Sequence, residues 1–167
     1  EGEGTPIVLL HGGGVDHAML SWKTIMQTWT GSQPLVALDL PGYGNSDKPE
    51  LEYSLSFYTG FLNAFLDTLN AQNVTLCGLS MGGAIALQYA LRYPNYIGKL
   101  VLVAPWGVSA SAPYSLIGRL LVRLPLNQVA YKTLQNRWLA KNIIAGSLIG
   151  NREKITPEIL DEVQTAA

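Results

Sequence analysis

The stretch that decides the fold is residues 74–83, VTLCGLSMGG. Its first four residues form an apolar run that predicts a buried strand, because strands of a parallel sheet are covered on both faces and need not alternate. A G-x-S-x-G pattern follows from Gly78 to Gly82, and the residues after it predict a helix that ends before Pro94. The two glycines have no Cβ to collide across a tight turn. We therefore expect Ser80 in a strained turn at a helix N-terminus, where unpaired N–H groups favour an oxyanion.

Length and composition limit the class of protein. The chain has 167 residues, of which 48% are hydrophobic and 14% charged, so it is globular and holds one domain or a large piece of one. A net charge of −1 argues against nucleic-acid binding, and the apolar stretches are too short to span a membrane. The single cysteine, Cys77, excludes an intrachain disulfide and is interpreted as a core residue. Its isolation fits a reducing compartment and indicates a cytoplasmic location.

Strands and helices alternate along the first part of the chain. Apolar runs predict strands at residues 6–10, 35–38, 74–77 and 100–104. Helices are predicted at residues 21–29, after the capping residue Ser54, and at 84–93. This order predicts a doubly wound α/β fold with a mostly parallel sheet and right-handed crossovers. Ligands of such sheets bind beyond the carboxyl ends of the strands, and the turn that holds Ser80 leaves from that edge.

The predicted secondary structure changes after residue 107. Helices are predicted at 116–124, 128–144 and 157–164, with no further strand of comparable quality. We expect a core domain over residues 1–107 and the start of a helical lid over 108–167. The chain begins without methionine and stops inside a predicted helix, so we expect a fragment whose C-terminal strands are missing.

Four segments together resemble the α/β-hydrolase fold superfamily, in its lid-bearing serine esterase and carbon–carbon hydrolase types. They are LHGGG at 10–14, LDLPGYGNSDKP at 38–49, GLSMGG at 78–83 and LVLVAP at 100–105. Their order matches the third to sixth strands of that fold, and the motif around Ser80 is similar to its nucleophile elbow.

The resemblance implies a role for each matching residue. Ser80 is implied to be the nucleophile, and the backbone N–H groups of Gly13 and Met81 the oxyanion hole. Gly12 and Gly14 flank that loop and are expected to contact substrate. After the last matching segment, Trp106 is expected either to line the acyl pocket or to anchor the hinge of the lid.

The chain departs from the family in its acid and base. The triad order in this fold is serine, acid, histidine, yet His11 and His17 both precede Ser80. The resemblance implies a structural role for His11, and His17 is interpreted as an ordinary loop residue. Asp39 is expected to shape its loop rather than to act as the acid. No Asp or Glu lies between residues 67 and 153, so the acid and base are expected beyond the end of this chain.

The sequence thus predicts a serine hydrolase that cleaves an ester-like small molecule through an acyl-enzyme. A carbon–carbon bond hydrolase with the same serine, and a non-catalytic protein that binds a small ligand, stay open as alternatives. No cofactor or metal site is expected, since no dinucleotide motif and no Cys/His cluster occurs. The oligomeric state is undetermined. The lid region carries basic residues that form either a solvated face or a patch for anionic ligands: Arg119, Arg123, Lys132, Arg137 and Lys141.

Overall fold

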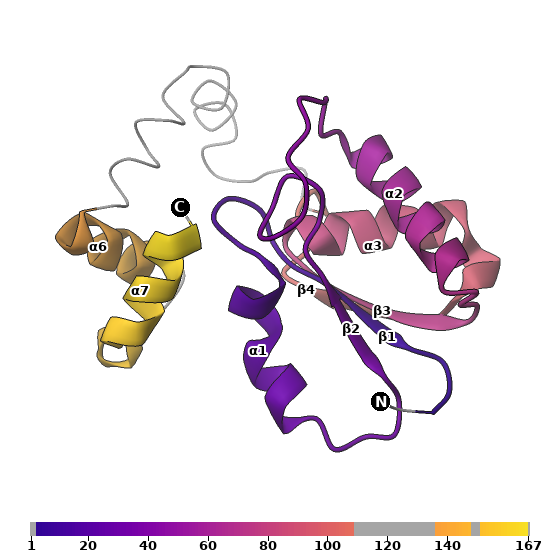
Figure 1. Ribbon diagram of the computed structural model, residues 1–167, viewed down its shortest axis with the longest axis horizontal. Helices are drawn as coiled ribbons and strands as arrows, with labels where there is room; N and C mark the ends of the chain where they lie inside the picture. The colour runs from indigo at the N-terminus through magenta and orange to yellow at the C-terminus, as the bar shows by residue number, and fades with distance from the viewer. Residues whose placement is uncertain (1–2, 109–135, 148–150, 167) are drawn as a thin grey trace. The chain divides into compact units, whose positions relative to one another are not determined.

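The computed structural model describes residues 3–108, 136–147 and 151–166. The chain divides into two compact units, Glu1–Val108 and Ser109–Ala167, and each is described by itself (Figure 1). The predicted helix at 116–124 lies outside the described residues, as do Arg119, Arg123 and Lys132.

The first unit is built on a four-stranded parallel sheet in the order β2-β1-β3-β4. Its strands are β1 (Ile7–Leu10), β2 (Leu35–Leu38), β3 (Val74–Leu79) and β4 (Ile97–Val103). The helices between them are α1 (Ala18–Thr28), α2 (Leu55–Thr68), α3 (Met81–Arg92) and the short 3₁₀ helix η1 (Pro94–Tyr96). The predicted α/β class and parallel sheet are therefore confirmed.

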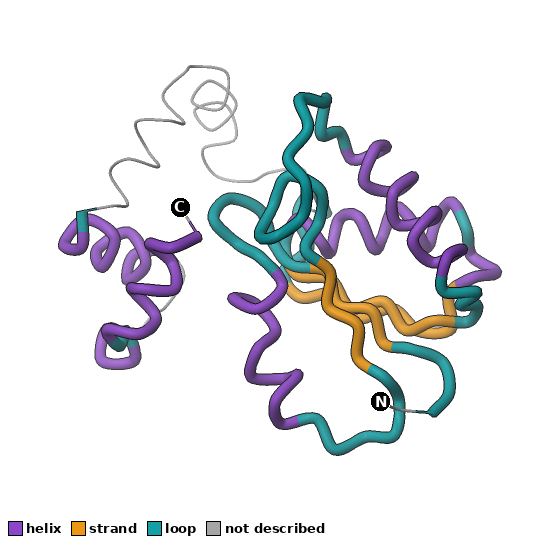
Figure 2. The backbone as a smooth tube through the Cα atoms, viewed as in Figure 1, coloured by secondary structure: helices purple, strands orange, loops and turns teal. Residues whose placement is uncertain are grey.

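The helices cover both faces of the sheet. The chain moves one way along the sheet from β1 to β2 and the other way from β2 through β3 to β4, so right-handed crossovers place α1 on one face and α2 with α3 on the other. Figures 1 and 2 show this layering. The main core lies under α2 and α3, where Leu62, Leu66, Ile85 and Tyr89 are fully buried.

The register of the sheet brings four strand ends to one edge. Leu10, the last residue of β1, pairs with Leu38 at the end of β2 and with Gly78 in β3, while Leu79 pairs with Val103 at the end of β4. The residues that follow these strands therefore start from the same edge. The strand order reverses about β1, which makes this edge the expected place for a ligand.

Element boundaries differ from prediction where polar residues or distant contacts intervene. Helix α2 is capped by Ser54 as predicted, since the Ser54 hydroxyl accepts a hydrogen bond from the N–H of Phe57 at 3.1 Å. Helix α1 begins at Ala18, three residues earlier than expected, because the carboxylate of Asp39 accepts the Ala18 N–H from outside the helix. Strand β4 begins three residues early, at Ile97, because the backbone pairs with β3 regardless of side-chain polarity.

In the second unit, two helices contact each other. They are α6 (Arg137–Ser147) and α7 (Pro157–Ala166), with the 3₁₀ helix η2 (Arg152–Lys154) before α7. Among the described residues of this unit, the buried side chains are Ala140, Ile155, Leu160 and Val163. The guanidinium of Arg137 forms an ion pair with the exposed carboxylate of Asp161, so at least one basic residue of this region has an acidic partner.

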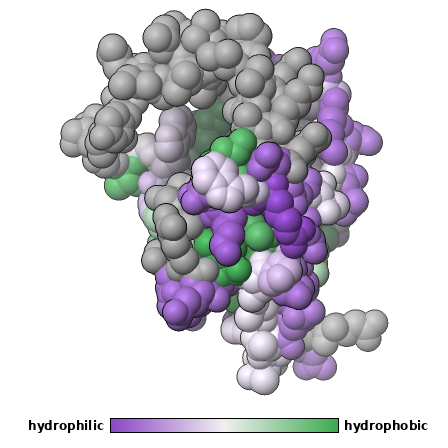
Figure 3. All heavy atoms as spheres, turned by 90° about the vertical axis from the view of Figure 1, so that its left-hand side faces the viewer, coloured by the Kyte–Doolittle hydropathy of each residue, from purple (hydrophilic) through white to green (hydrophobic). Residues whose placement is uncertain are grey.

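The described surface is mixed rather than uniformly polar. Figure 3 shows one face on which hydrophilic side chains predominate and hydrophobic ones appear between them. Among the described residues, no helix is both long enough and apolar enough to cross a membrane.

Candidate functional site

Ser80 occupies a strained turn between β3 and α3. Its backbone angles are φ 49° and ψ −110°, a combination that residues with a Cβ rarely adopt. The turn is held by its own backbone groups: the Ser80 N–H donates to the carbonyl of Val103 at 3.0 Å, and the Ser80 carbonyl accepts from the N–H of Trp106 at 2.9 Å. Strand β4 and the loop after it therefore stabilise the strained conformation that the sequence predicted.

The glycines around Ser80 permit close approach of backbone segments. A Cβ on Gly78 would collide with the carbonyl of Gly82, and a Cβ on Gly82 would collide with the carbonyl of Leu10 at the end of β1. A Cβ on Gly83 would lie 2.9 Å from Cβ of Pro105. The pattern G-x-S-x-G-G is thus required by packing against β1 and β4, as well as by the turn itself.

The glycine-rich loop after β1 lies directly against this turn. A Cβ placed on Gly12 would be 3.6 Å from Cβ of Ser80, and one placed on Gly13 would be 3.7 Å from Cβ of Met81. The carbonyl of His11 also accepts the N–H of Gly82 at 3.1 Å, which ties the start of the loop to the first turn of α3. Two segments that are far apart in the sequence therefore meet at Ser80.

His11 is fully buried and uses both ring nitrogens. The N–H of Leu40 donates to Nε2 at 3.0 Å, so the ring proton resides on Nδ1, which donates to the carbonyl of Gly12 at 2.7 Å. Burial lowers the pKa of His11 below its ordinary value, so the ring is neutral at pH 7. A neutral imidazole with both nitrogens engaged has no lone pair free to accept a proton from Ser80.

The bond from His11 also orients the next backbone N–H group. The carbonyl of Gly12 and the N–H of Gly13 belong to one planar trans peptide, and in such a peptide they point in opposite directions. Because the carbonyl is directed at His11, the N–H of Gly13 is directed away from it. None of the hydrogen bonds among the described residues uses that N–H.

Met81, the other residue expected to donate, carries its backbone N–H at this turn. It is the first residue of α3, and N–H groups in the first turn of a helix have no acceptor within the helix. Its side chain contacts the loop side of the site, since the Tyr43 hydroxyl lies 3.6 Å from the Met81 sulfur. Gly13 and Met81, the two residues expected to donate, are therefore neighbours.

Both oxygens of the Asp39 carboxylate accept hydrogen bonds from backbone groups. Its carboxylate accepts the backbone N–H groups of Ala18 at 2.8 Å and Asn45 at 2.9 Å. Burial by itself would raise the pKa of Asp39, but these hydrogen bonds outweigh it and the pKa is lowered. This geometry agrees with the expected role in shaping the loop.

Asp16 was not singled out from the sequence, although it contacts the loop directly. Its Oδ2 accepts the N–H of Gly12 at 2.6 Å and its Oδ1 accepts the N–H of His17 at 2.8 Å. The Ser21 hydroxyl donates to the same carboxylate, 2.6 Å from Oδ2 and 2.7 Å from Oδ1. An Asp two residues before the start of α1 was the signal available, since carboxylates stabilise helix N-termini.

Two of the remaining predicted residues, Gly14 and Trp106, are exposed. Gly14 has φ +79° with open space around its Cα, and Trp106 is 67% exposed. Cys77 is partly exposed rather than fully buried, so its interpretation as a plain core residue needs correction: it lies on β3, one residue before Gly78. Burial nevertheless raises the pKa of its thiol.

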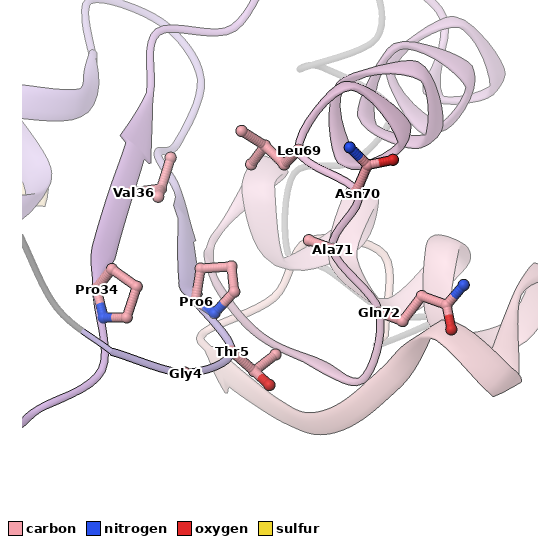
Figure 4. Close-up of a pocket in the computed structure, with 9 residues that line it drawn as sticks. All are labelled: Gly4, Thr5, Pro6, Pro34, Val36, Leu69, Asn70, Ala71 and Gln72. Atoms are coloured by element: carbon pink, nitrogen blue, oxygen red, sulfur yellow. The ribbon is translucent and has the colours of Figure 1, made fainter.

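A pocket of roughly 470 Å³ lies at the opposite edge of the sheet (Figure 4). Pro6 and Pro34 precede β1 and β2, and Ala71 follows α2, so its walls belong to the amino ends of the strands. No charged side chain lines it. It is separated from Ser80 by the length of β3, about 20 Å at 3.3 Å per residue. In the described part of the chain, no group of three or more His, Cys, Asp or Glu residues could hold a metal ion.

Comparison with known proteins gives a consistent picture. The family model described as alpha/beta hydrolase fold matches residues 5–135. The chain is 36% identical over 110 residues to 2-hydroxy-6-oxo-2,4-heptadienoate hydrolase of Pseudomonas putida, covering 65% of this chain and 40% of that protein.

Two solved structures share this fold. A haloalkane dehalogenase from Agrobacterium tumefaciens has a TM-score of 0.75 at 30% identity, covering 99% of this chain and 56% of that one. A meta-cleavage product hydrolase from Pseudomonas fluorescens has a TM-score of 0.79 at 23% identity, covering 99% and 57%, and so shows the fold alone. The chain spans about two fifths of the curated relatives' length.

Proposed function

This chain belongs to the α/β-hydrolase fold family, and we propose that it carries the nucleophile of a serine hydrolase that cleaves ester-like small molecules. The single observation that carries the proposal is the backbone of Ser80, at φ 49° and ψ −110°, with the glycine-rich loop lying against it. Strain of this kind persists only where the surrounding structure enforces it, and it concentrates at active sites.

The chemistry follows from the groups around Ser80. Its Oγ forms a bond to the carbonyl carbon of the substrate while its proton passes to a base, and the carbonyl oxygen becomes an oxyanion. The N–H groups of Gly13 and Met81 are free to donate to that oxyanion, which is the role we assign to them. The tetrahedral intermediate then expels the alcohol, and water hydrolyses the acyl-enzyme. The exposed residues Gly14 and Trp106 are proposed to contact the substrate, whereas Gly12, expected from the sequence to do so, is buried with its N–H and carbonyl engaged by Asp16 and His11.

Serine as the nucleophile argues against dehalogenation, the activity named for one group of relatives. Attack on a haloalkane by a carboxylate gives an ester, which water can hydrolyse. Attack by the Ser80 hydroxyl would give an alkyl ether, which water does not hydrolyse under these conditions, so the enzyme would be blocked after one turnover. An acyl carbon is the substrate centre that regenerates Ser80.

The base and the acid are proposed to lie outside residues 1–167. No histidine follows Ser80 in this sequence, and both ring nitrogens of His11 are engaged. A family member places acid and histidine after the nucleophile in chain order.

Carbon–carbon hydrolysis is the second candidate, favoured by the 36% identity to the Pseudomonas putida hydrolase. The same serine could attack the ketone of a vinylogous diketone, in which case the leaving group is a stabilised carbanion that must be protonated. Lid residues would set this choice. A non-catalytic binding protein is the third possibility, and it requires that Ser80 be unreactive.

A fluorophosphonate probe tests the proposal on the complete gene product that carries this sequence. Labelling at Ser80, with loss of labelling in Ser80→Ala, supports an activated nucleophile; no labelling of a well-folded protein favours the binding protein. Removing the nucleophile of a serine hydrolase costs on the order of 10⁶ in kcat, so Ser80→Ala is expected to abolish turnover. Parallel assays with p-nitrophenyl acetate and with 2-hydroxy-6-oxo-2,4-heptadienoate then distinguish ester from carbon–carbon cleavage.

A further inference from the structure

We propose that Asp16 is a positioning residue that holds the oxyanion loop in its donating conformation; this inference rests on the proposed function. The Asp16 carboxylate accepts the Gly12 N–H at 2.6 Å, and a hydrogen bond to a carboxylate is stronger than one between neutral groups. Gly12 lies between His11 and Gly13, so the loop is held at the residue that precedes the proposed donor.

Asp16 and His11 together hold both peptide groups of Gly12. Asp16 holds the N–H of the first, and His11 holds the carbonyl of the second at 2.7 Å. Because the second peptide carries the Gly13 N–H, fixing both planes fixes the direction of that donor. Gly12 has no side chain to restrict its backbone, so without these bonds the loop would sample many conformations.

The carboxylate is itself held from two sides. The N–H of His17 and the hydroxyl of Ser21 donate to it, and both residues belong to the start of α1. The N-terminus of a helix favours a negative charge, so α1 offsets the charge of Asp16 near the site. The helix thus acts as a fixed support from which Asp16 reaches back four residues to Gly12.

Asp39 provides a matched control. It also accepts an N–H at the start of α1, from Ala18, yet none of its described hydrogen bonds reaches the Gly12 loop. A change that only weakened α1 would have similar effects at Asp16 and Asp39. A change that misdirects the oxyanion donor would affect Asp16 alone.

The test uses Asp16→Asn, Asp16→Ala and Asp39→Asn in the complete gene product. Gly12 and His17 donate to different oxygens of Asp16, and in Asp16→Asn one of these positions becomes an NH₂ group, which cannot accept a hydrogen bond. Loss of one oxyanion donor costs about 10²–10³ in kcat, and we expect Asp16→Ala to lose on the order of 10–10² through misalignment of the donor. KM should change much less, because the oxyanion forms only in the transition state. Affinity for a trifluoromethyl ketone, whose adduct carries an oxyanion, should fall in parallel with kcat.

Asp39→Asn is expected to lower the melting temperature while kcat stays near the wild-type value. The proposal is overturned if folded Asp16 variants keep wild-type kcat and ketone affinity, or if Asp39→Asn loses kcat equally. Should the Asp16 variants fail to fold, Ser21→Ala, which removes one support of the carboxylate, must still lower kcat and ketone affinity. Fluorophosphonate labelling of wild-type Ser80 separates the two failures: if it is absent, the proposed function fails, whereas labelling with unaffected Asp16 variants defeats only this inference.

Discussion

Replacing Ser80 by glycine should give a more stable protein than replacing it by alanine. Both changes remove the hydroxyl, but only glycine removes the Cβ that makes φ 49° and ψ −110° costly. Strain in such backbone regions costs about 1–3 kcal/mol per residue. Against this, glycine loses more conformational freedom than alanine on folding, at a cost of about 0.4–1 kcal/mol. The difference favours Ser80→Gly by about 1 kcal/mol.

The assay is urea denaturation of the two variants in the complete gene product, followed by a tryptophan or circular-dichroism signal. Ala64, an exposed residue in α2, is the control for the usual effect of glycine on the free energy of unfolding, since Ala64→Gly should destabilise the protein by about 1 kcal/mol. The reversal of sign between the two positions is the prediction. If Ser80→Ala proved as stable as Ser80→Gly or more so, the turn would not be strained, and the observation that carries the proposed function would be lost.

Three further results are expected. Gly82→Ala, whose Cβ would meet the carbonyl of Leu10, should destabilise the protein by about 1–3 kcal/mol in denaturation. Gly60→Ala, with open space in α2, should stabilise it by up to about 1 kcal/mol. Equal effects of the two changes would contradict the close packing at α3. Gly13→Val, which crowds the loop, should lower kcat more than it raises KM, and a pure KM effect would remove it from the oxyanion hole. Because burial lowers the pKa of His11, its contribution to stability should be complete above about pH 6.5, the ordinary pKa of histidine in an unfolded chain, and should be lost as the pH falls below it. The difference in unfolding free energy between wild type and His11→Gln should therefore shrink from pH 8 to pH 5. A constant difference would argue against a buried neutral ring.

The sequence predicted the sheet and the Ser80 turn well because both depend on local signals. Apolar runs mark the strands, Ser54 marks the start of α2, and the glycines around Ser80 mark a turn that only small residues allow. These features are encoded within a few residues of one another. The prediction that the carboxyl ends of the strands share one edge followed from the parallel order.

Contacts between distant segments were not predictable in the same way. Helix α1 starts at Ala18 because Asp39, 21 residues later, accepts its N–H. The role of His11 as a donor to Gly12 depends on the N–H of Leu40, which fixes the ring tautomer from 29 residues away. Asp16 was not singled out from the sequence, and only the folded loop reveals its bond to Gly12. Each of these is a hydrogen bond between a backbone group and a side chain. Such a bond depends on one residue at each end, so it produces no periodic pattern in the sequence.

Residues 1–167 on their own should show no useful Ser80-dependent hydrolysis. The chain has two histidines: both ring nitrogens of His11 are engaged, and Nδ1 of His17 is buried without a partner among the described residues. If neither histidine accepts the Ser80 proton, activity would come from binding and the oxyanion hole alone, about 10³–10⁴ over water in a serine protease stripped of its triad.

The isolated chain should also associate in solution. Strand β4 lies at the edge of the described sheet, and its residues Val101 and Val103 are 46% and 42% exposed. An exposed apolar edge strand invites pairing with another chain. Hydrolysis of p-nitrophenyl acetate beside a Ser80→Ala control, with size-exclusion chromatography, tests both expectations. A monodisperse monomer with Ser80-dependent turnover at the level of ordinary esterases would show that the base is already present, and His17 would then be the residue to replace first.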